Sequence, residues 1–305
     1  MKIGLSCKAY STDLSDTQVK TFSQLKKIGF DCLDLGINGS YCTPAPIFLQ
    51  DRKIWVDYFK QLKNMIENEG LTVFQTHGTY KPDFDQDHPF EFTQKVVDQF
   101  NKEIEACAIL GSKYIVIHPI AKAVMPFREQ PDLALKRDDF LDNMTALKKL
   151  EPALKEFGVK ACLENLFLFS LHSRHTVETG CSTPQDLLDY KNGLNNPQNY
   201  GICLDTGHLN VLWQDPISAV KTLKDNLDVL HLHDNDRSDS HQAIGTGTID
   251  WVAFCNALKE INFKGVFNLE LSYANALKIS KQHAWDYIKF AYNGAKTVLQ
   301  QTNLL

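Results

Sequence analysis

Short apolar runs alternate with longer amphipathic stretches along the whole chain, and this alternation restricts the possible folds more than any other feature. The runs read KIGLSC, FDCLDLG, LTVFQTH, YIVIHP, VKACLEN, YGICLDT, DVLHLHD and GVFNLELS. Each run is nearly continuously apolar, as strands of a parallel sheet are when helices cover the sheet. Eight strand–helix units in 305 residues predict an α/β protein, a (β/α)8 TIM barrel that occupies residues 1–305 as a single domain.

The stretches between the runs carry helical periodicity and helix-end signals. In 89–110, which begins at Pro89, apolar residues recur four apart from Val96 to Ala108, and Gly111 follows. A further helix is expected over 140–157, ended by Gly158. An open doubly wound sheet is the main alternative. No phosphate-binding glycine motif such as GxGxxG follows any run, however, which favours the barrel.

Composition limits the compartment and the partners. No segment approaches the roughly 18 consecutive apolar residues of a membrane helix, and MKIGLSCKAY lacks the long apolar region of a signal peptide. The eight cysteines are scattered without a CxxC pair, which predicts reduced thiols and a cytoplasmic protein. A formal net charge of −5 argues against a nucleic-acid partner. The sequence leaves open whether the protein is a homo-oligomer.

Polar side chains recur where the apolar runs end. These residues are His77, His118, Glu164, Asp205, the pair His231 and His233, and Glu270. Taken singly, each has a structural explanation, such as a helix cap for Asp205. In a (β/α)8 barrel, however, the strand ends open on one face, where active sites are built. Oxygen and nitrogen donors without thiolate suit Mn²⁺, Mg²⁺ or Co²⁺, and Zn²⁺ is also compatible.

The ordered series of motifs resembles that of the xylose-isomerase-like barrels. It reads THGTY, VIHP, CLEN, CLDTGH, LHLHDND, DSHQAIGTGTIDW and NLELS, and it extends over essentially the whole chain. That group includes sugar and sugar-phosphate isomerases and epimerases, ketose 3-epimerases, inosose dehydratase and endonuclease IV. The resemblance implies one divalent metal ion, with Mn²⁺ the first choice. Its implied ligands are Glu164, Asp205, His231 and Glu270, with His233 as the alternative to His231.

The resemblance also implies a reaction. A sugar or sugar-phosphate isomerase or epimerase removes the proton α to a carbonyl, and the metal ion stabilises the enediolate that forms. Glu164 and Glu270 are then the acid/base pair. The implied substrate-binding residues are His208, His77, His118, Arg237 and His233. A solvated loop charge is the alternative for Arg237.

Three other functions compete with this one. Endonuclease IV uses nine ligands for three metals, and the corresponding residues here are His77, His118, Glu164, Asp205, His208, His231, Asp239, His241 and Glu270. Two departures favour the isomerase or epimerase: the segment LENLFLFSLHSRHT, and DTGH where the nuclease usually has DTCH. An inosose dehydratase-type lyase would begin with the same proton removal. A non-catalytic sugar-binding barrel would predict the loss of a carboxylate, and none is lost.

Two further features accompany these motifs. Tyr10, Phe167, Phe169 and Trp213 are aromatic residues near strand ends, and we expect core or lid packing or a sugar-covering role for them. The segment GTGTIDW predicts a turn into a helix capped by Asp250, and its amides could alternatively bind a phosphate.

Overall fold

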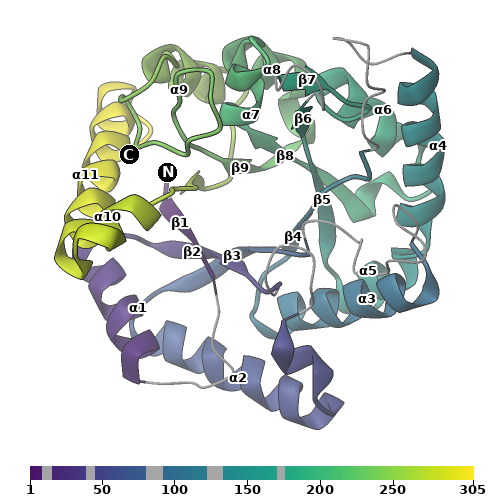
Figure 1. The fold of residues 1–305 in the computed structure, drawn as a ribbon, viewed down its shortest axis with the longest axis horizontal. Helices are drawn as coiled ribbons and strands as arrows, with labels where there is room; N and C mark the ends of the chain where they lie inside the picture. The colour runs from purple at the N-terminus through teal and green to yellow at the C-terminus, as the bar shows by residue number, and fades with distance from the viewer. Residues whose placement is uncertain (9–15, 39–44, 80–91, 122–132, 170–175) are drawn as a thin grey trace.

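The computed structural model describes residues 1–8, 16–38, 45–79, 92–121, 133–169 and 176–305. Tyr10 and Pro89 lie outside these residues. Eight parallel strands form the wall of the barrel, in the order β10-β1-β2-β3-β4-β5-β8-β9 (Figure 1). Their bounds are β1 Ile3–Lys8, β2 Cys32–Gly36, β3 Thr72–His77, β4 Tyr114–Ile117, β5 Lys160–Glu164, β8 Tyr200–Asp205, β9 Leu227–His231 and β10 Phe267–Leu269.

The barrel closes between β9 and β10. Leu232, directly after β9, forms a parallel bridge with Leu269. The Leu232 N–H donates to the Asn268 carbonyl oxygen at 2.9 Å, and the Glu270 N–H donates to the Leu232 carbonyl oxygen at 2.9 Å. The predicted (β/α)8 TIM barrel is therefore confirmed.

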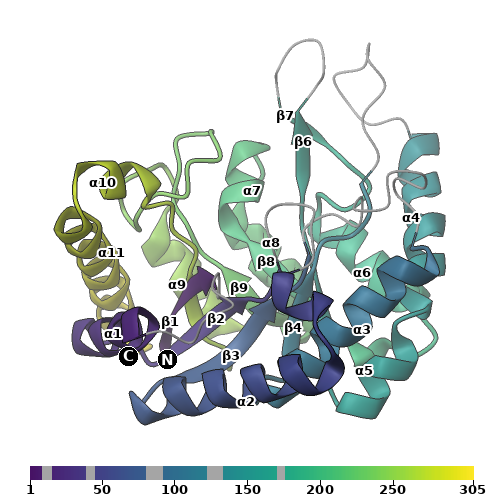
Figure 2. The same cartoon turned by 60° about the horizontal axis from the view of Figure 1, so that its bottom comes forward.

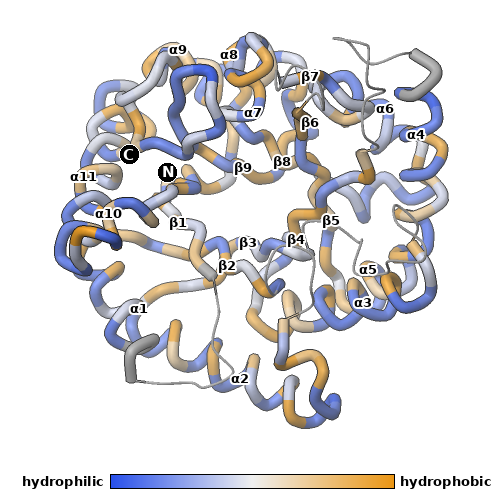
Figure 3. Tube along the Cα trace, viewed as in Figure 1, coloured by the Kyte–Doolittle hydropathy of each residue, from blue (hydrophilic) through white to orange (hydrophobic). Residues whose placement is uncertain are grey.

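Helices surround the strands, and Figure 3 shows the hydrophobic segments of β5, β8 and β9 inside a ring of helices that alternate between hydrophilic and hydrophobic residues. The α-helices are α1 Asp16–Ile28, α2 Arg52–Asn68, α3 Gln94–Ile109, α4 Leu133–Lys148, α5 Glu151–Phe157, α6 Pro184–Gly193, α7 Thr206–Val211, α8 Pro216–Leu223, α9 Trp251–Glu260, α10 Ala274–Ile279 and α11 Lys281–Gln301. Short 3-10 turns lie at η1 Pro46–Leu49, η2 Pro197–Asn199 and η3 Lys224–Asn226. Within the described residues, none of the helices combines the length and apolar character needed to cross a membrane.

Two predicted helices are wrong in their extent. The helix expected over 89–110 begins only at Gln94, with Thr93 as its N-cap. The stretch 140–157 is not continuous, because α4 ends at Lys148 and α5 begins at Glu151. Pro152 lies in the first turn of α5, where its missing N–H costs nothing, but its ring disfavours a helix that continues through it. The glycine signals at the helix ends are confirmed, since Gly111 and Gly158 have φ values of 85° and 64°.

An antiparallel hairpin interrupts the strand–helix alternation after β5. It consists of β6 Phe167–Phe169 and β7 Thr176–Glu178, and it rises above the barrel (Figure 2). The hairpin was not expected, because its two strands contain only three residues each. The hairpin therefore forms a wall at one side of the barrel mouth.

A small apolar layer fills the barrel interior below its mouth. It contains Val116, Cys162, Cys203 and Val229, all fully buried. They come from β4, β5, β8 and β9. The two cysteines are small core residues here, as the sequence predicted.

Candidate metal centre

Strand periodicity positions the site directly above this apolar layer. Glu164, Asp205 and His231 each lie two residues beyond a layer residue on the same strand, and side chains two apart point to the same side of a strand. They therefore also point inward, at the carboxyl ends of the strands. Glu270 joins them from the residue after β10.

These four residues form the first cluster. Each offers one ligand atom, and the four atoms lie within 4.8 Å of one another. His231 Nδ1 lies 3.1 Å from Glu164 Oε1 and 3.3 Å from Glu270 Oε2. The structure thus brings together all four residues that the resemblance implied as metal ligands, and it places His231 rather than His233 among them.

The geometry of Asp205 is compatible with both roles that the sequence presented as alternatives. It is the N-cap of α7, where its Oδ1 accepts from the His208 N–H at 2.7 Å. Its Oδ2 is buried and has no hydrogen-bond partner among the described residues. A buried carboxylate oxygen without a donor is costly unless a cation binds it. The same side chain can therefore cap the helix and ligate a metal ion.

Charge accumulates in the first cluster. Burial alone would raise the pKa of Glu164, but the neighbouring His231 and His118 hold it well below its usual range. Burial alone would lower the pKa of His231, but Cys203 and the Glu270 and Glu164 carboxylates raise it well above its usual range. Ionised carboxylates beside a histidine are the donors that a divalent cation requires.

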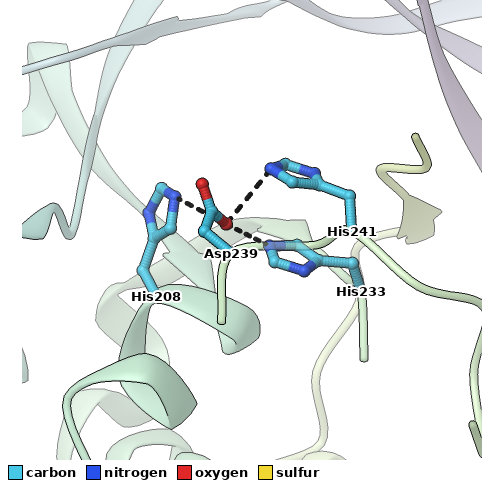
Figure 4. A group of neighbouring side chains, drawn as sticks. All are labelled: His208, His233, Asp239 and His241. Carbon is cyan, nitrogen blue, oxygen red and sulfur yellow. Dashed lines mark ion pairs between the residues drawn. The ribbon is translucent and has the colours of Figure 1, made fainter. Parts of the chain in front are cut away.

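The second cluster lies beside the first. His208, His233, Asp239 and His241 each offer a ligand atom within 4.8 Å of the others, and Figure 4 shows the three imidazole rings around the Asp239 carboxylate. Asp239 Oδ1 is 3.3 Å from His241 Nε2, 3.8 Å from His233 Nε2 and 3.9 Å from His208 Nε2. Burial opposes protonation of His241, but its hydrogen bond to Asp239 and the Glu270 charge raise its pKa to about 10.

A third cluster contains His77, His118 and Glu164. Glu164 Oε2 lies 3.4 Å from His77 Nε2 and 3.1 Å from His118 Nε2. Burial lowers the pKa of His118 despite the Glu164 charge. All nine residues of the three-metal pattern thus meet at one barrel mouth, and Glu164 belongs to both the first and the third cluster.

Backbone carbonyl groups orient several of these histidines. Nδ1 of His77 lies 2.9 Å from the Gly78 carbonyl oxygen, and Nδ1 of His208 lies 2.8 Å from that of Asn165. Nδ1 of His241 lies 3.2 Å from the Glu270 carbonyl oxygen. A carbonyl oxygen only accepts, so each Nδ1 is the donor and each Nε2 faces the clusters, where it can ligate a metal ion once it carries no proton. Such outer hydrogen bonds are typical of metal-binding histidines.

Arg237 turns away from the clusters. Its guanidinium donates to the Asn210 carbonyl oxygen at 2.8 Å and lies 4.2 Å from the centre of the Trp213 ring. Among the other aromatic residues considered, Phe167 contacts the His208 ring edge-on at 5.2 Å, while Phe169 is exposed. The substrate-binding roles of Arg237 and of the histidines stay predictions.

The GTGTIDW segment makes the predicted turn into α9, and Asp250 caps that helix by accepting from the Ala253 N–H at 2.9 Å. The buried Asp234 holds this turn in place. It accepts from the Gly245 N–H at 2.9 Å and from the Trp251 indole N–H at 2.8 Å. The role of its amides in phosphate binding stays a prediction.

Two residues that support the site were not singled out from the sequence. Asp34, in the middle of β2, lies 2.9 Å from His231 Nε2. Burial would raise the pKa of Asp34, but its hydrogen bond to His231 and the charge of that ring lower it. Asn165 pairs with the backbone of Asp205 in both directions, at 2.8 and 3.0 Å. The available signals were a carboxylate inside FDCLDLG and the residue after Glu164 in CLEN.

Comparison with known proteins agrees with this geometry. The family model described as xylose isomerase-like TIM barrel matches residues 22–288. The chain therefore belongs to the xylose isomerase-like TIM barrels, a family that includes sugar isomerases and epimerases.

Three relatives show how broad this family is. The chain is 24% identical to protein MJ1311 of Methanocaldococcus jannaschii, over 95% of this chain and 90% of that protein. It is 25% identical to the inosose isomerase of Bacillus subtilis, over 62% of this chain and 65% of the isomerase. It is 25% identical to a probable endonuclease 4 of Mesoplasma florum, over 68% of each chain.

Solved structures show the same fold. A D-tagatose 3-epimerase-like protein superimposes with a TM-score of 0.69 at 21% identity, over 99% of this chain and 98% of the other. The IolI protein, whose crystal structure has a bound zinc atom, superimposes with a TM-score of 0.66 at 18% identity, over 99% of this chain and 98% of the other. At these identities the likeness shows the fold alone.

Proposed function

We propose that this protein is a divalent-metal-dependent isomerase or epimerase of a sugar or sugar phosphate. The observation that carries the proposal is the first cluster: three carboxylates and one histidine at the carboxyl ends of barrel strands, with four ligand atoms within 4.8 Å. The Asp205 Oδ2, which has no hydrogen-bond partner in the part of the chain that the structure describes, and the oxygen-rich donor set fit a divalent cation, of which Mn²⁺ is our first choice. The epimerase and isomerase names among the relatives, and the zinc bound by IolI, support a metal-dependent isomerase or epimerase.

In the proposed mechanism, the cation would be held by Glu164, Asp205, His231 and Glu270. When bound, the cation polarises the substrate carbonyl and hydroxyl oxygens and stabilises negative charge that develops on them. Glu164 lies at the end of β5 and Glu270 after β10, with β8 and β9 between them in the barrel wall. This separation lets one glutamate remove the α-proton while the other returns a proton from the other side.

Two features around the first cluster support substrate binding. His77, His118 and His208 line the same mouth, and each can donate or accept a hydrogen bond to a sugar hydroxyl. Phe167, on the hairpin beside His208, offers an apolar face of the kind that covers a sugar ring. A small carbohydrate therefore suits the mouth better than a long polyanion.

The test is solvent-proton exchange at the α-carbon, measured by NMR in D₂O with a panel of ketoses, aldoses and their phosphates plus Mn²⁺. Glu164→Gln and Glu270→Gln should each reduce exchange by roughly 10²–10⁴-fold, the usual contribution of a general acid or base. The matched control is Glu105→Gln on α3, whose carboxylate pairs with Arg52 outside the barrel, and it should exchange normally. Near-normal exchange in both cluster variants would show that neither glutamate is the base.

An endonuclease IV-like phosphodiesterase is the second candidate. The observation that favours it is the meeting of all nine expected ligands in three clusters. One feature opposes it: a Cβ atom at Gly207 would overlap the His233 ring, so the cysteine expected there in the nuclease does not fit beside His233. Metal analysis separates the two functions. One tightly bound ion with sugar turnover supports the isomerase, whereas three zinc ions with cleavage of abasic DNA would replace it.

A further inference from the structure

Asp34 contacts the ring nitrogen of His231 that does not face Glu164 and Glu270. It is 1% exposed, on β2, and its Oδ2 lies 2.9 Å from His231 Nε2. The same oxygen accepts from Ser6 Oγ at 2.7 Å and from Asn268 Nδ2 at 3.3 Å. Asn268 Nδ2 also donates to Ser6 Oγ at 3.0 Å. β1 and β10 thus hold the Asp34 carboxylate where β9 brings His231.

His231 differs from His77, His208 and His241 in the ring nitrogen that faces its orienting partner. His77, His208 and His241 donate through Nδ1 to backbone carbonyl groups and turn Nε2 toward the clusters. The Nε2 of His231 instead faces Asp34, and its Nδ1 faces Glu164 and Glu270. The partner of His231 is also a carboxylate rather than a carbonyl group, which makes this the stronger hydrogen bond.

From this geometry we propose that Asp34 is a positioning residue for the metal centre: it keeps the Nε2 proton on His231 so that Nδ1 binds the ion. The inference rests on the proposed function, because it assumes that the first cluster binds a metal ion. A carboxylate behind a ligating histidine fixes the ring orientation and makes the ligating nitrogen more basic. The strand pairings of β1 with β2 and β10 place this carboxylate independently of any substrate.

The experiment follows His231 in protein labelled with ¹⁵N-histidine, titrated with chelator-buffered Zn²⁺ and observed through long-range ¹H–¹⁵N correlations. The His231 signals are assigned by their absence in His231→Asn. In the wild-type protein we expect zinc to bind Nδ1 while Nε2 keeps its proton. The Kd read from His231 should rise about 10–100-fold in Asp34→Asn, the usual effect of losing such a partner. The amide of that variant can still accept from Nε2 but carries no charge.

Asp228→Asn is the matched control. Asp228 is a largely buried carboxylate on β9 that pairs with Lys160 at 2.7 Å, away from the clusters. Its replacement should leave the zinc Kd at His231 within about twofold of the wild-type value. An equal loss of affinity in Asp228→Asn and Asp34→Asn would overturn the proposal, since it would reflect general loosening of the barrel.

The remaining outcomes distinguish failure of the role proposed for Asp34 from failure of the proposed metal centre. Zinc on Nε2 of wild-type His231, or an unchanged Kd in Asp34→Asn, would overturn the role of Asp34 alone. The first of these needs no variant, so it decides the question even if Asp34→Asn does not fold. If wild-type His231 does not respond to zinc or Mn²⁺ at all, the proposed metal centre itself is wrong, and the role of Asp34 falls with it.

Discussion

Gly207 and His233 provide a direct test of how the mouth of the barrel is packed. Gly207 lies in α7, and a Cβ atom at this position would overlap Cε1, Nε2 and Nδ1 of the His233 ring. The ring cannot easily retreat, because it is fully buried and stacks on His241 with centroids 3.9 Å apart. Carbon atoms need roughly 3.5 Å of separation, so Gly207→Ala must displace the ring by more than about 1 Å.

We expect Gly207→Ala to lower the free energy of unfolding by about 1–3 kcal/mol, the usual cost of overpacking a core. The loss of unfolding free energy caused by Gly207→Ala should disappear or reverse in a protein in which His233 has already been replaced. In His233→Ala the space is open, and alanine is favoured over glycine in a helix by roughly 0.5–1 kcal/mol. Gly207→Ala should therefore be neutral or stabilising in that background.

The assay is a double-mutant cycle measured by urea unfolding of the wild-type protein, both single variants and the double variant. The midpoint should move while the slope m stays constant. The cycle isolates the coupling between the two positions, because the cost of His233→Ala itself cancels. An equal effect of Gly207→Ala in both backgrounds, or no effect in the wild-type protein, would refute the packing argument.

Two further predictions concern protons. The pKa of His241 is raised to about 10 and that of His231 is also raised, so metal binding at neutral pH should displace protons from the clusters. Metal affinity should rise with pH, and calorimetry in buffers of different ionisation enthalpy should count at least one proton released; a count of zero would contradict this. Asp215→Ala removes the cap of α8, where Asp215 accepts from the Ile217 and Ser218 N–H groups, and should cost about 1 kcal/mol at neutral pH. Burial alone would raise the pKa of Asp215, but hydrogen bonds from the Ser218 hydroxyl and from the Ile217 and Ser218 N–H groups together lower it. The cap therefore stabilises above the unfolded pKa of about 4 and is lost as pH falls through the folded pKa. The difference in melting temperature between the two proteins should shrink in acid, and a constant difference would mean that the carboxylate charge is not involved.

The barrel was predictable because it follows from local patterns, whereas the four residues of the first cluster were implied by the family resemblance, and their role as metal ligands stays a prediction. Apolar runs identify the strands, and two-residue periodicity turns Glu164, Asp205 and His231 to the same side as the buried layer beneath them. The break between α4 and α5 and the hairpin after β5 were harder to predict from the sequence. A single proline decides the first, and the strands of the second are too short to show a period.

Contacts between residues far apart in the sequence determine the remaining features of the site, and no local sequence pattern encodes these contacts. Asp34 meets His231 across 197 positions of sequence because only β10 and β1 lie between β9 and β2 in the closed barrel, and both side chains point to its interior. The turn of Arg237 toward Trp213 follows from loop conformation, which residue type does not reveal. The choice between His231 and His233 was open in the sequence because both share strand parity. In the structure His231 is the last residue of β9 and belongs to the first cluster, whereas His233 lies beyond the strand, packs on Gly207 and belongs to the second cluster.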